Sequence, residues 1–304
     1  MSTNSTIGWT DDTRNFAAGC SEPKLLDGTM SQECAHCYAR LLSVRLAAMM
    51  SAGTPSAGKA RIAALYGGVS ERRGGGAAWT GTFRHDPILL AEAFAGMRAG
   101  KITFAGSMTD LFHAEHAPEL LTLIAGEIRK LAALPAARQP RGIVLLTKRP
   151  ERLLTWQRRE FPDGLPAFVW PGVTGGYQPS ADERLPTLLR VRADGPLVLS
   201  AEPLLGALDA RGYVEATWIE RAAGRLNRGM FPLTADGQTS RLGWLITGCE
   251  SGPKRRPTDP DWIRSLRDQC ADHGVPFFLK QMIVGGEVIA EPEIDGRQHV
   301  AFPA

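Results

Sequence analysis

Three cysteines near the start of the chain have the spacing of ligands for a metal centre. They are Cys20, Cys34 and Cys37, and the last two form a C-x2-C pair. Such a pair places two thiolates on one tight turn, where both can bind one centre, while the third returns across a loop. An iron–sulfur cluster held by three cysteines keeps one iron open for a small molecule, which makes it chemically active. We interpret the motif as a 4Fe–4S site.

Two other interpretations of these cysteines stay open. Structural zinc normally has four protein ligands, so His36 or a distant residue would have to be the fourth. The thiols could also carry no metal. The other two cysteines stand alone in the sequence: Cys270 has the pattern of a core thiol on an amphipathic helix, and Cys249 ends an apolar run, where we expect it to pack.

A second set of candidates consists of polar residues that follow short apolar runs. They are Ser107, Asp110, Thr147, Lys148, Arg149, Thr174, Glu202, Glu250, Lys280 and Gln281. Opposite charges that converge on one site can bind the ammonium and carboxylate groups of an amino-acid moiety. Glu202 and Glu250 follow their runs closely and should be partly desolvated. The alternative is a buried charge network that pairs Glu202 with Lys148 and Glu250 with Lys280.

The apolar runs themselves predict the elements that position these residues. They cover residues 102–105, 143–146, 167–170, 197–199, 244–246 and 276–279. The runs do not alternate between apolar and polar, which is typical of parallel strands covered on both faces. Helical patterns lie between them, with the clearest at 118–134 and 259–273. Strand, polar turn and helix therefore repeat in the manner of βαβ units.

Two further strands, at 7–16 and 79–84, would bring the number to eight. We therefore predict an α/β fold, a closed or nearly closed (β/α)8 barrel of the TIM type with an N-terminal three-cysteine loop. In such a barrel the active site lies at the carboxyl ends of the strands. A doubly wound open sheet is the competing fold. No G-x-G-x-x-G follows an early strand, which argues against a dinucleotide-binding sheet.

The predicted domain organisation is one barrel with an appended tail. The barrel covers 1–285 and includes the cluster-binding motif at 20–38. The segment 208–241 is too long for one barrel connection, so we expect an insertion there. The tail 286–304 reads as a hairpin that turns near Asp295-Gly296. The Gly- and Ser-rich segment 51–78 reads as a flexible loop around a short helix.

Composition and charge narrow the class of protein. With 304 residues, 43% of them hydrophobic and 22% charged, the chain can bury a large core. We find no run of about 18 apolar residues, so no membrane span is expected. The first twenty residues lack a basic start and an apolar centre, so we expect a cytoplasmic protein. The net charge of +3 permits a nucleic-acid or phosphate partner without demanding one.

Several sequence blocks resemble one known family. The opening from Ile7-Gly8-Trp9-Thr10 to Cys34-x2-Cys37-Tyr38-Ala39 resembles the three-cysteine-motif phage-associated family, which is common in phage genomes and described as a domain of unknown function. Further matching blocks follow in the family's order at 107–113, 146–152, 172–174, 181–184, 200–206, 248–253 and 276–281. The gap between the first two cysteines is longer than is usual in that family, and glycine is usual where Cys249 stands.

This family in turn resembles the radical S-adenosylmethionine (radical SAM) superfamily. The shared features are three cysteines near the N-terminus, an aromatic residue beside them and an expected barrel. The usual spacing is C-x3-C-x2-C, and only the second half fits here. The resemblance implies an enzyme that binds SAM at the open iron of a 4Fe–4S cluster. An external electron donor would then allow a 5′-deoxyadenosyl radical to form and to abstract hydrogen from a substrate.

The resemblance also implies roles for the candidate residues. Cys20, Cys34 and Cys37 would hold the cluster. The expected catalytic residues are Glu202, Glu250, Lys148 and Lys280. The expected cofactor-binding residues are His36, Tyr38, Ser107, Asp110, Thr147, Thr174, Glu202 and Glu250.

The expected substrate is a nucleic acid or nucleotide that is modified or repaired, since the family is associated with phages. Lys254-Arg255-Arg256 would suit such a substrate. The alternative function is a nucleic-acid-binding or interaction protein in which the same cysteines hold structural zinc or a structural iron–sulfur cluster.

Overall fold

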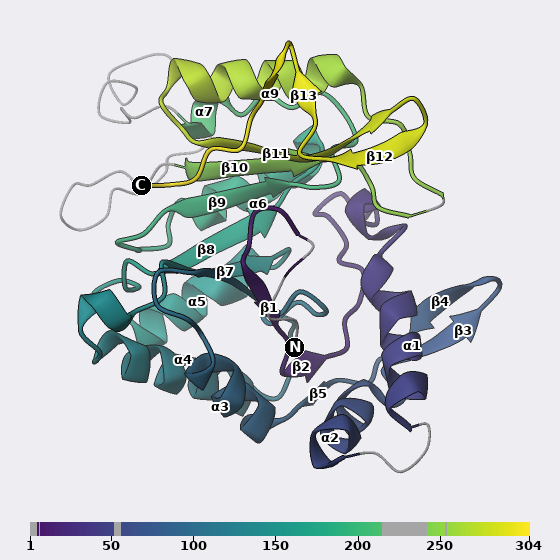
Figure 1. The fold of residues 1–304 in the computed structure, drawn as a ribbon, viewed down its shortest axis with the longest axis vertical. Coiled ribbons are helices and arrows are strands. Elements are labelled where there is room, and N and C mark those ends of the chain that lie inside the picture. Colours follow the sequence, from purple (N-terminus) through teal and green to yellow (C-terminus); the bar gives the residue numbers. More distant parts are fainter. Residues whose placement is uncertain (1–4, 6, 52–55, 215–241, 253) are drawn as a thin grey trace.

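The centre of the fold is one curled sheet of eight strands (Figure 1). The computed structural model describes residues 5, 7–51, 56–214, 242–252 and 254–304. In spatial order the strands are β1 (Asp12–Arg14), β6 (Ile102–Ala105), β7 (Gly142–Thr147), β8 (Val169–Thr174), β9 (Leu197–Ala201), β10 (Leu242–Gly248), β11 (Phe277–Val284) and β12 (Glu287–Ala290). All neighbours are parallel except β11 and β12.

The six apolar runs are confirmed as strands of this sheet, β6 to β11. Their continuous hydrophobicity has the expected cause, since both faces are covered. In β7, for example, Ile143 and Leu145 pack among residues of the helices, while Val144 packs on the other face. The spatial order of the strands follows their order in the sequence, so all carboxyl ends of the parallel strands meet at one edge.

The predicted (β/α)8 barrel is wrong, because the sheet is a half-barrel that does not close. Closure would require β1 to pair with β11, but β12 occupies that edge of β11. The chain reverses at Gly285 and Gly286, whose positive φ angles of 58° and 89° suit a two-residue hairpin turn.

The stretch predicted as an eighth strand, 79–84, lies outside the sheet. It only joins β4 (Gly76–Trp79) to β5 (Arg84–His85). The doubly wound alternative also fails, because the strand order never reverses.

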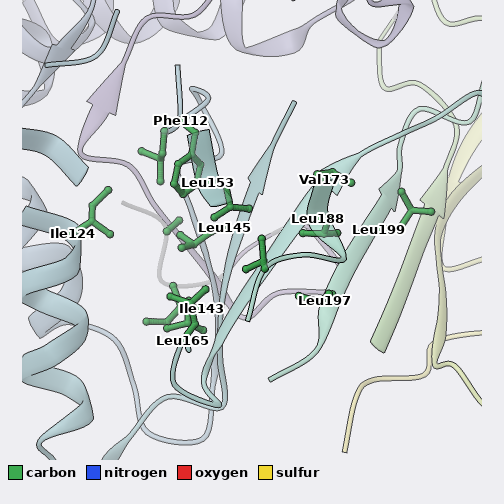
Figure 2. Close-up of a cluster of buried hydrophobic side chains, with 14 of the residues drawn as sticks. Phe112, Ile124, Ile143, Leu145, Leu153, Leu165, Val173, Leu188, Leu197 and Leu199 are labelled. Atoms are coloured by element: carbon green, nitrogen blue, oxygen red, sulfur yellow. The ribbon is translucent and has the colours of Figure 1, made fainter. Parts of the chain in front are cut away.

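Helices cover the convex face of the sheet. They are α3 (Pro87–Ala95), α4 (Pro118–Ala132), α5 (Pro150–Glu160), α6 (Gln178–Leu188), α7 (Arg211–Val214) and α9 (Pro260–Asp272). The predicted helices at 118–134 and 259–273 are confirmed as α4 and α9. Each has a proline in its first turn, and Asp259 caps α9 through the N–H of Asp261. Figure 2 shows how Ile124 and Leu153 of this layer approach Ile143 and Leu145.

The concave face is filled at one end by an aromatic cluster. Trp244 lies at its centre, with ring centroids 6.0 Å from Trp9 and 5.7 Å from Trp170. The chain end closes this cluster, since Phe302 packs 5.5 Å from Trp244 and Trp244 Nε1 donates to the carbonyl of Ala301. The tail therefore belongs to the core of the sheet.

Small elements between β1 and β6 form a separate group, along the right and bottom of Figure 1. They are β2 (Ala17–Ala18), which pairs with β5, the 3-10 turn Gln32–Cys34, α1 (Tyr38–Ser51), α2 (Ala57–Tyr66), and the hairpin of β3 (Ser70–Arg73) with β4. The segment expected as a flexible loop around a short helix thus contains α2 and a hairpin; residues 52–55 lie outside the described part.

The remaining predictions concern the insertion and the tail. Of the expected insertion 208–241, only 208–214 is described, and it contains α7. In the tail, β13 (Glu293–Ile294) pairs with β14 (Arg297–Gln298) around Asp295 and Gly296. Among the described residues, no helix is long and apolar enough to cross a membrane.

Candidate functional site

A cavity of about 780 Å³ opens on the concave face at the carboxyl ends of the strands. Its lining includes Trp9, Phe104 and Leu146, which also contact the aromatic cluster, so the cavity lies directly against that cluster. The predicted site residues in its lining are Cys20, Cys34, Cys37, Tyr38, Ser107, Asp110, Thr147, Lys148, Arg149, Thr174, Glu202, Lys280 and Gln281. Residues far apart in the sequence therefore meet at one site.

The three N-terminal cysteines all line this cavity. Cys20 follows β2, Cys34 ends the 3-10 turn, and Cys37 directly precedes α1. Burial, together with the negative charge of Asp110, raises the pKa of the Cys20 thiol to about 12. Burial also raises the pKa of Cys34. All five cysteines of the chain are free thiols in the structure.

No group of three His, Cys, Asp or Glu side chains that could hold a metal ion is present in the described part of the chain. A 4Fe–4S cluster binds each cysteine through a separate iron, so its thiolates need not converge on one ion. The absence of such a group among the described residues therefore bears on a site for a single metal ion, and not on a four-iron cluster.

Lys148 supplies positive charge beside the cysteines. Although burial alone would lower it, the pKa of Lys148 is raised, because Cys34 and Glu33 favour the charged ammonium. Within the described residues its Nζ forms no ion pair. Lys148 and Arg149 in turn favour the Cys20 thiolate. The cavity thus carries cations that match the negative charge of bound thiolates.

Asp110 ties the ends of β6 and β7 together. Its carboxylate accepts from Thr147 Oγ1 at 2.7 Å, from the Lys148 N–H at 3.0 Å and from Arg149 Nη1 at 2.8 Å. Burial would raise the pKa of Asp110, but the Arg149 charge and these hydrogen bonds hold it below its usual range. Asp110 is therefore a fixed anion that orients Arg149.

A set of hydrogen bonds holds the loop of Cys20. Arg149 donates to the Ser21 carbonyl at 3.0 Å, and Ser21 Oγ lies 2.6 Å from His113 Nε2. On the other side of Cys20, Thr109 donates to the carbonyl of Gly19. Residues after β6 and after β7 therefore set the position of this cysteine from both sides.

The Cys34 turn is held by a buried ion pair that the sequence did not reveal to us. Glu33 Oε1 lies 3.1 Å from Arg184 Nη1 on α6 and accepts from the N–H of Gly176 at 3.1 Å. Arg184 also donates to Ser31 Oγ at 2.9 Å. A side chain at Gly176 would collide with the carbonyl of Pro203, so only glycine allows this approach. The turn is thereby fixed to the strand end of β8.

Glu250 and His36 contact each other outside the residues that line the cavity. His36 Nδ1 lies 3.0 Å from Glu250, which also accepts from the Arg256 N–H at 2.7 Å. Burial would raise the pKa of Glu250, but hydrogen bonds from Arg256 and His36 lower it to about 2. Glu250 therefore binds the C-x2-C turn to the loop after β10.

Within the cavity, Glu202 pairs with Lys280. Lys280 Nζ lies 2.9 Å from Glu202 Oε1, and Lys280 is about one-fifth exposed. The charge network that we considered from the sequence, Glu202 with Lys148 and Glu250 with Lys280, is therefore paired differently. Tyr38 donates its hydroxyl to the Ser107 carbonyl at 2.6 Å, which joins α1 to the end of β6.

The basic segment after Glu250 is largely engaged in contacts within the protein. Arg256 pairs with Glu250, and Arg255 donates to the carbonyls of Gly252 and Gly286. Lys254 is exposed.

Sequence reasoning missed several residues of the site, among them Glu33, Arg184, Asn15 and Tyr66. The position of Glu33 next to Cys34 was a possible signal, but its partner on α6 is 151 residues away. Asn15 accepts from the Met108 N–H at 3.1 Å, and nothing in its surrounding sequence marked it.

Comparison with known proteins gives a family match over almost the whole chain. A family model described as a protein of unknown function (DUF5131) matches residues 4–303. No curated protein and no solved structure matches the chain. The match includes the sheet, the cysteines and the cavity, but its description carries no reaction.

Proposed function

Because the chain belongs to the DUF5131 family, whose function is unknown, we propose a function from its site: a radical SAM-like iron–sulfur enzyme that acts on a nucleic-acid or nucleotide substrate. The observation that supports the proposal most is the meeting of Cys20, Cys34 and Cys37 in one cavity with the carboxyl ends of the parallel strands. Ligands of α/β sheets commonly bind at these ends.

The residues of the cavity suit a three-cysteine cluster. Cys20, Cys34 and Cys37 would hold it as thiolates. Lys148 favours the charged form of Cys20 and of Cys34, and Arg149 favours that of Cys20. A 4Fe–4S cluster with one open iron would supply electrons to SAM bound there. The five free thiols agree with a cytoplasmic protein, and the proposal requires an external electron donor.

The other polar residues have roles in binding SAM and substrate. Glu202 offers a carboxylate to the SAM ammonium or ribose group, while Lys148 offers a cation to its carboxylate. Thr147, Thr174 and Ser107 supply hydroxyl groups in the same lining. Glu250 and His36 act from outside the lining by holding the cysteine turn.

Anaerobic purification tests the cluster first. We expect a brown protein with about four irons per chain. Stoichiometric zinc without iron would overturn the cluster and favour the alternative, a nucleic-acid-binding or interaction protein with a structural metal. Titration with SAM and a search for 5′-deoxyadenosine then test the reaction. If the loaded protein neither binds SAM at millimolar concentration nor cleaves it, the radical mechanism is wrong even though the cluster is present.

A further inference from the structure

Positive charge is concentrated in the group of small elements between β1 and β6. Residues 38–86 contain seven Lys and Arg against two Asp and Glu, a net charge of +5. The remainder of the chain contains 28 basic and 30 acidic residues, a net charge of −2. The weak positive charge of the whole protein therefore hides a strongly basic part and a slightly acidic one.

Four of these basic residues are free to bind an external anion. Arg45 on α1, Lys59 on α2, and Arg72 and Arg73 on β3 are exposed. None of them forms an ion pair or side-chain hydrogen bond with any residue in the described ranges. Most basic residues elsewhere in this group do have partners, as in the contact of Arg61 with Asp86 at 3.0 Å. We call Arg45, Lys59, Arg72 and Arg73 the basic face.

The elements that carry the basic face also form one wall of the cavity. This apolar wall consists of Leu42 and Leu46 from α1, Ile62, Leu65 and Tyr66 from α2, and Trp79 from β4. Each helix, and the β3–β4 hairpin, therefore contributes charge to solvent and apolar surface to the cavity. A ligand with a charged backbone and a flat apolar group would satisfy both.

Tyr66 provides a polar group within this wall. Its side chain is almost fully buried, at 3% exposure, and it lines the cavity. Its hydroxyl forms no hydrogen bond with the residues that the structure describes. Buried tyrosine hydroxyls usually have a partner, so a ligand in the cavity is a natural one. Trp79 adds an indole ring to the same wall.

We propose that this wall and the basic face bind single-stranded nucleic acid, with phosphates at the basic face and one base against Trp79 and Tyr66. The inference rests on the proposed function for the reaction that the bound strand undergoes, and it adds which surfaces of the protein hold that strand. A cavity of about 780 Å³ has the size of a small-molecule site. It suits a single base that has left its stack, which is how enzymes reach an atom of a base. Aromatic side chains bind such bases by stacking.

Binding of labelled oligonucleotides to the full chain tests the proposal. Fluorescence anisotropy compares a single strand, a duplex of the same sequence and poly-glutamate as an acidic protein mimic, at several salt concentrations. We expect the single strand to bind most tightly. Equal binding of the duplex would overturn the single-strand assignment, and equal binding of poly-glutamate would overturn nucleic acid as the partner.

Variants of the basic face test the phosphate contacts. The slope of log K against log salt is negative, and the double variant Arg72→Ala/Arg73→Ala should reduce its magnitude by about 1.4, since each phosphate contact with a single strand contributes about 0.7. Arg158→Ala is the matched control, because Arg158 is an exposed arginine of α5 far from these elements in sequence. An unchanged slope in the double variant, or an equal change in the control, would overturn the basic face.

Variants of the apolar wall test the base. Trp79→Ala should weaken single-strand binding about tenfold through the loss of stacking, and should have no such effect on a strand made only of abasic sites. Tyr66→Phe keeps the packing and should weaken base binding alone. If both variants leave the affinity unchanged while their thermal unfolding remains cooperative, no base enters the cavity.

These measurements use the protein with and without iron. If the protein binds the single strand but holds no iron and does not cleave SAM, this proposal is supported and the enzyme proposal fails. Loss of strand binding in a protein that still cleaves SAM would do the reverse.

Discussion

Arg184 Nη1 lies 3.1 Å from Glu33 Oε1, and both side chains are shut off from solvent, at 1% and 0% exposure. The pair joins α6 to the residue before Cys34, so the geometry of a proposed cluster ligand depends on a helix that contributes no residue to the lining of the cavity. Burial would raise the pKa of Glu33, but the Arg184 charge lowers it, which keeps the carboxylate ionised.

Breaking this pair should be costly. Arg184→Met leaves the Glu33 carboxylate buried without its cation, and we expect a loss of about 3–5 kcal/mol in the free energy of unfolding. Urea unfolding measures it. Lys130→Met on α4 is the control, because its exposed pair with Glu127 should contribute less than about 1 kcal/mol. Similar losses in both variants would mean that the buried pair has no special role.

Each proposed cluster ligand should be required for iron. Cys20→Ala, Cys34→Ala and Cys37→Ala should each abolish the four-iron complement, whereas Cys270→Ala should keep it, because Cys270 is buried in the helix-facing core. Iron analysis after anaerobic reconstitution measures this. A full complement in Cys20→Ala would show that the distant first cysteine is not a ligand.

The two candidate glutamates should behave differently. Glu202 lines the cavity, so Glu202→Gln should weaken SAM binding about tenfold with the iron content unchanged, through loss of a charge-assisted hydrogen bond. Glu250→Gln should instead reduce iron retention and stability, because Glu250 holds His36 and Arg256. Anaerobic calorimetry and iron analysis separate the two effects. A lower SAM affinity in Glu250→Gln at full iron content would contradict the structural assignment.

Acid should destabilise the protein through two histidines. Burial, aided by positive charge nearby, lowers the pKa of both His113 and His116 to about 4. Since an unfolded histidine has a pKa of about 6.5, the unfolded chain binds more protons between these values. Stability is therefore fully present above about pH 6.5 and is lost as pH falls toward 4.

Urea unfolding at pH 5 and pH 7 measures this difference. His116→Gln should reduce it, because the variant removes one titrating group. An unchanged pH dependence in the variant would show that His116 does not contribute.

The Cys20 loop should not tolerate a side chain at Gly19. Its φ is +99°, and a Cβ there would lie 2.3 Å from the Thr82 carbonyl oxygen. Gly19→Ala should lower both stability and bound iron. Gly81→Ala is the matched control, because Gly81 also has a positive φ of +82° but open space around it. It should lose only the backbone preference, about 1–2 kcal/mol. Equal effects would mean that the collision is relieved at no cost.

Much of the sheet could be predicted from the sequence, because its parallel strands are buried on both faces and appear as uninterrupted apolar runs. The run at 102–105 coincides with β6, and the proline and cap of α9 fixed the start of that helix. Closure could not be predicted. Closure depends on whether the outer edge of β11 is free to pair with β1. The Gly285-Gly286 turn brings β12 onto that edge, but in the sequence this turn resembled the start of a tail.

The candidate site divides in the same way. Asp110, Thr147 and Glu202 could be predicted as site residues, because the carboxyl ends of parallel strands meet at one edge of the sheet. The sequence could not place Glu250 outside the lining, since its partners Arg256 and His36 come from loops whose paths only the folded chain defines. The partner of Glu33 was hidden for the same reason.

The aromatic cluster next to the cavity also limits the side from which a ligand can enter. Trp244, Phe278 and Phe302 pack together inside the curl of the sheet, and the hydrogen bond from Trp244 to the Ala301 carbonyl holds the chain end against them. Packed aromatic side chains therefore occupy one end of the curled sheet. A nucleic-acid strand bound as we propose would therefore bring one base into the cavity from its open side and release it on the same side.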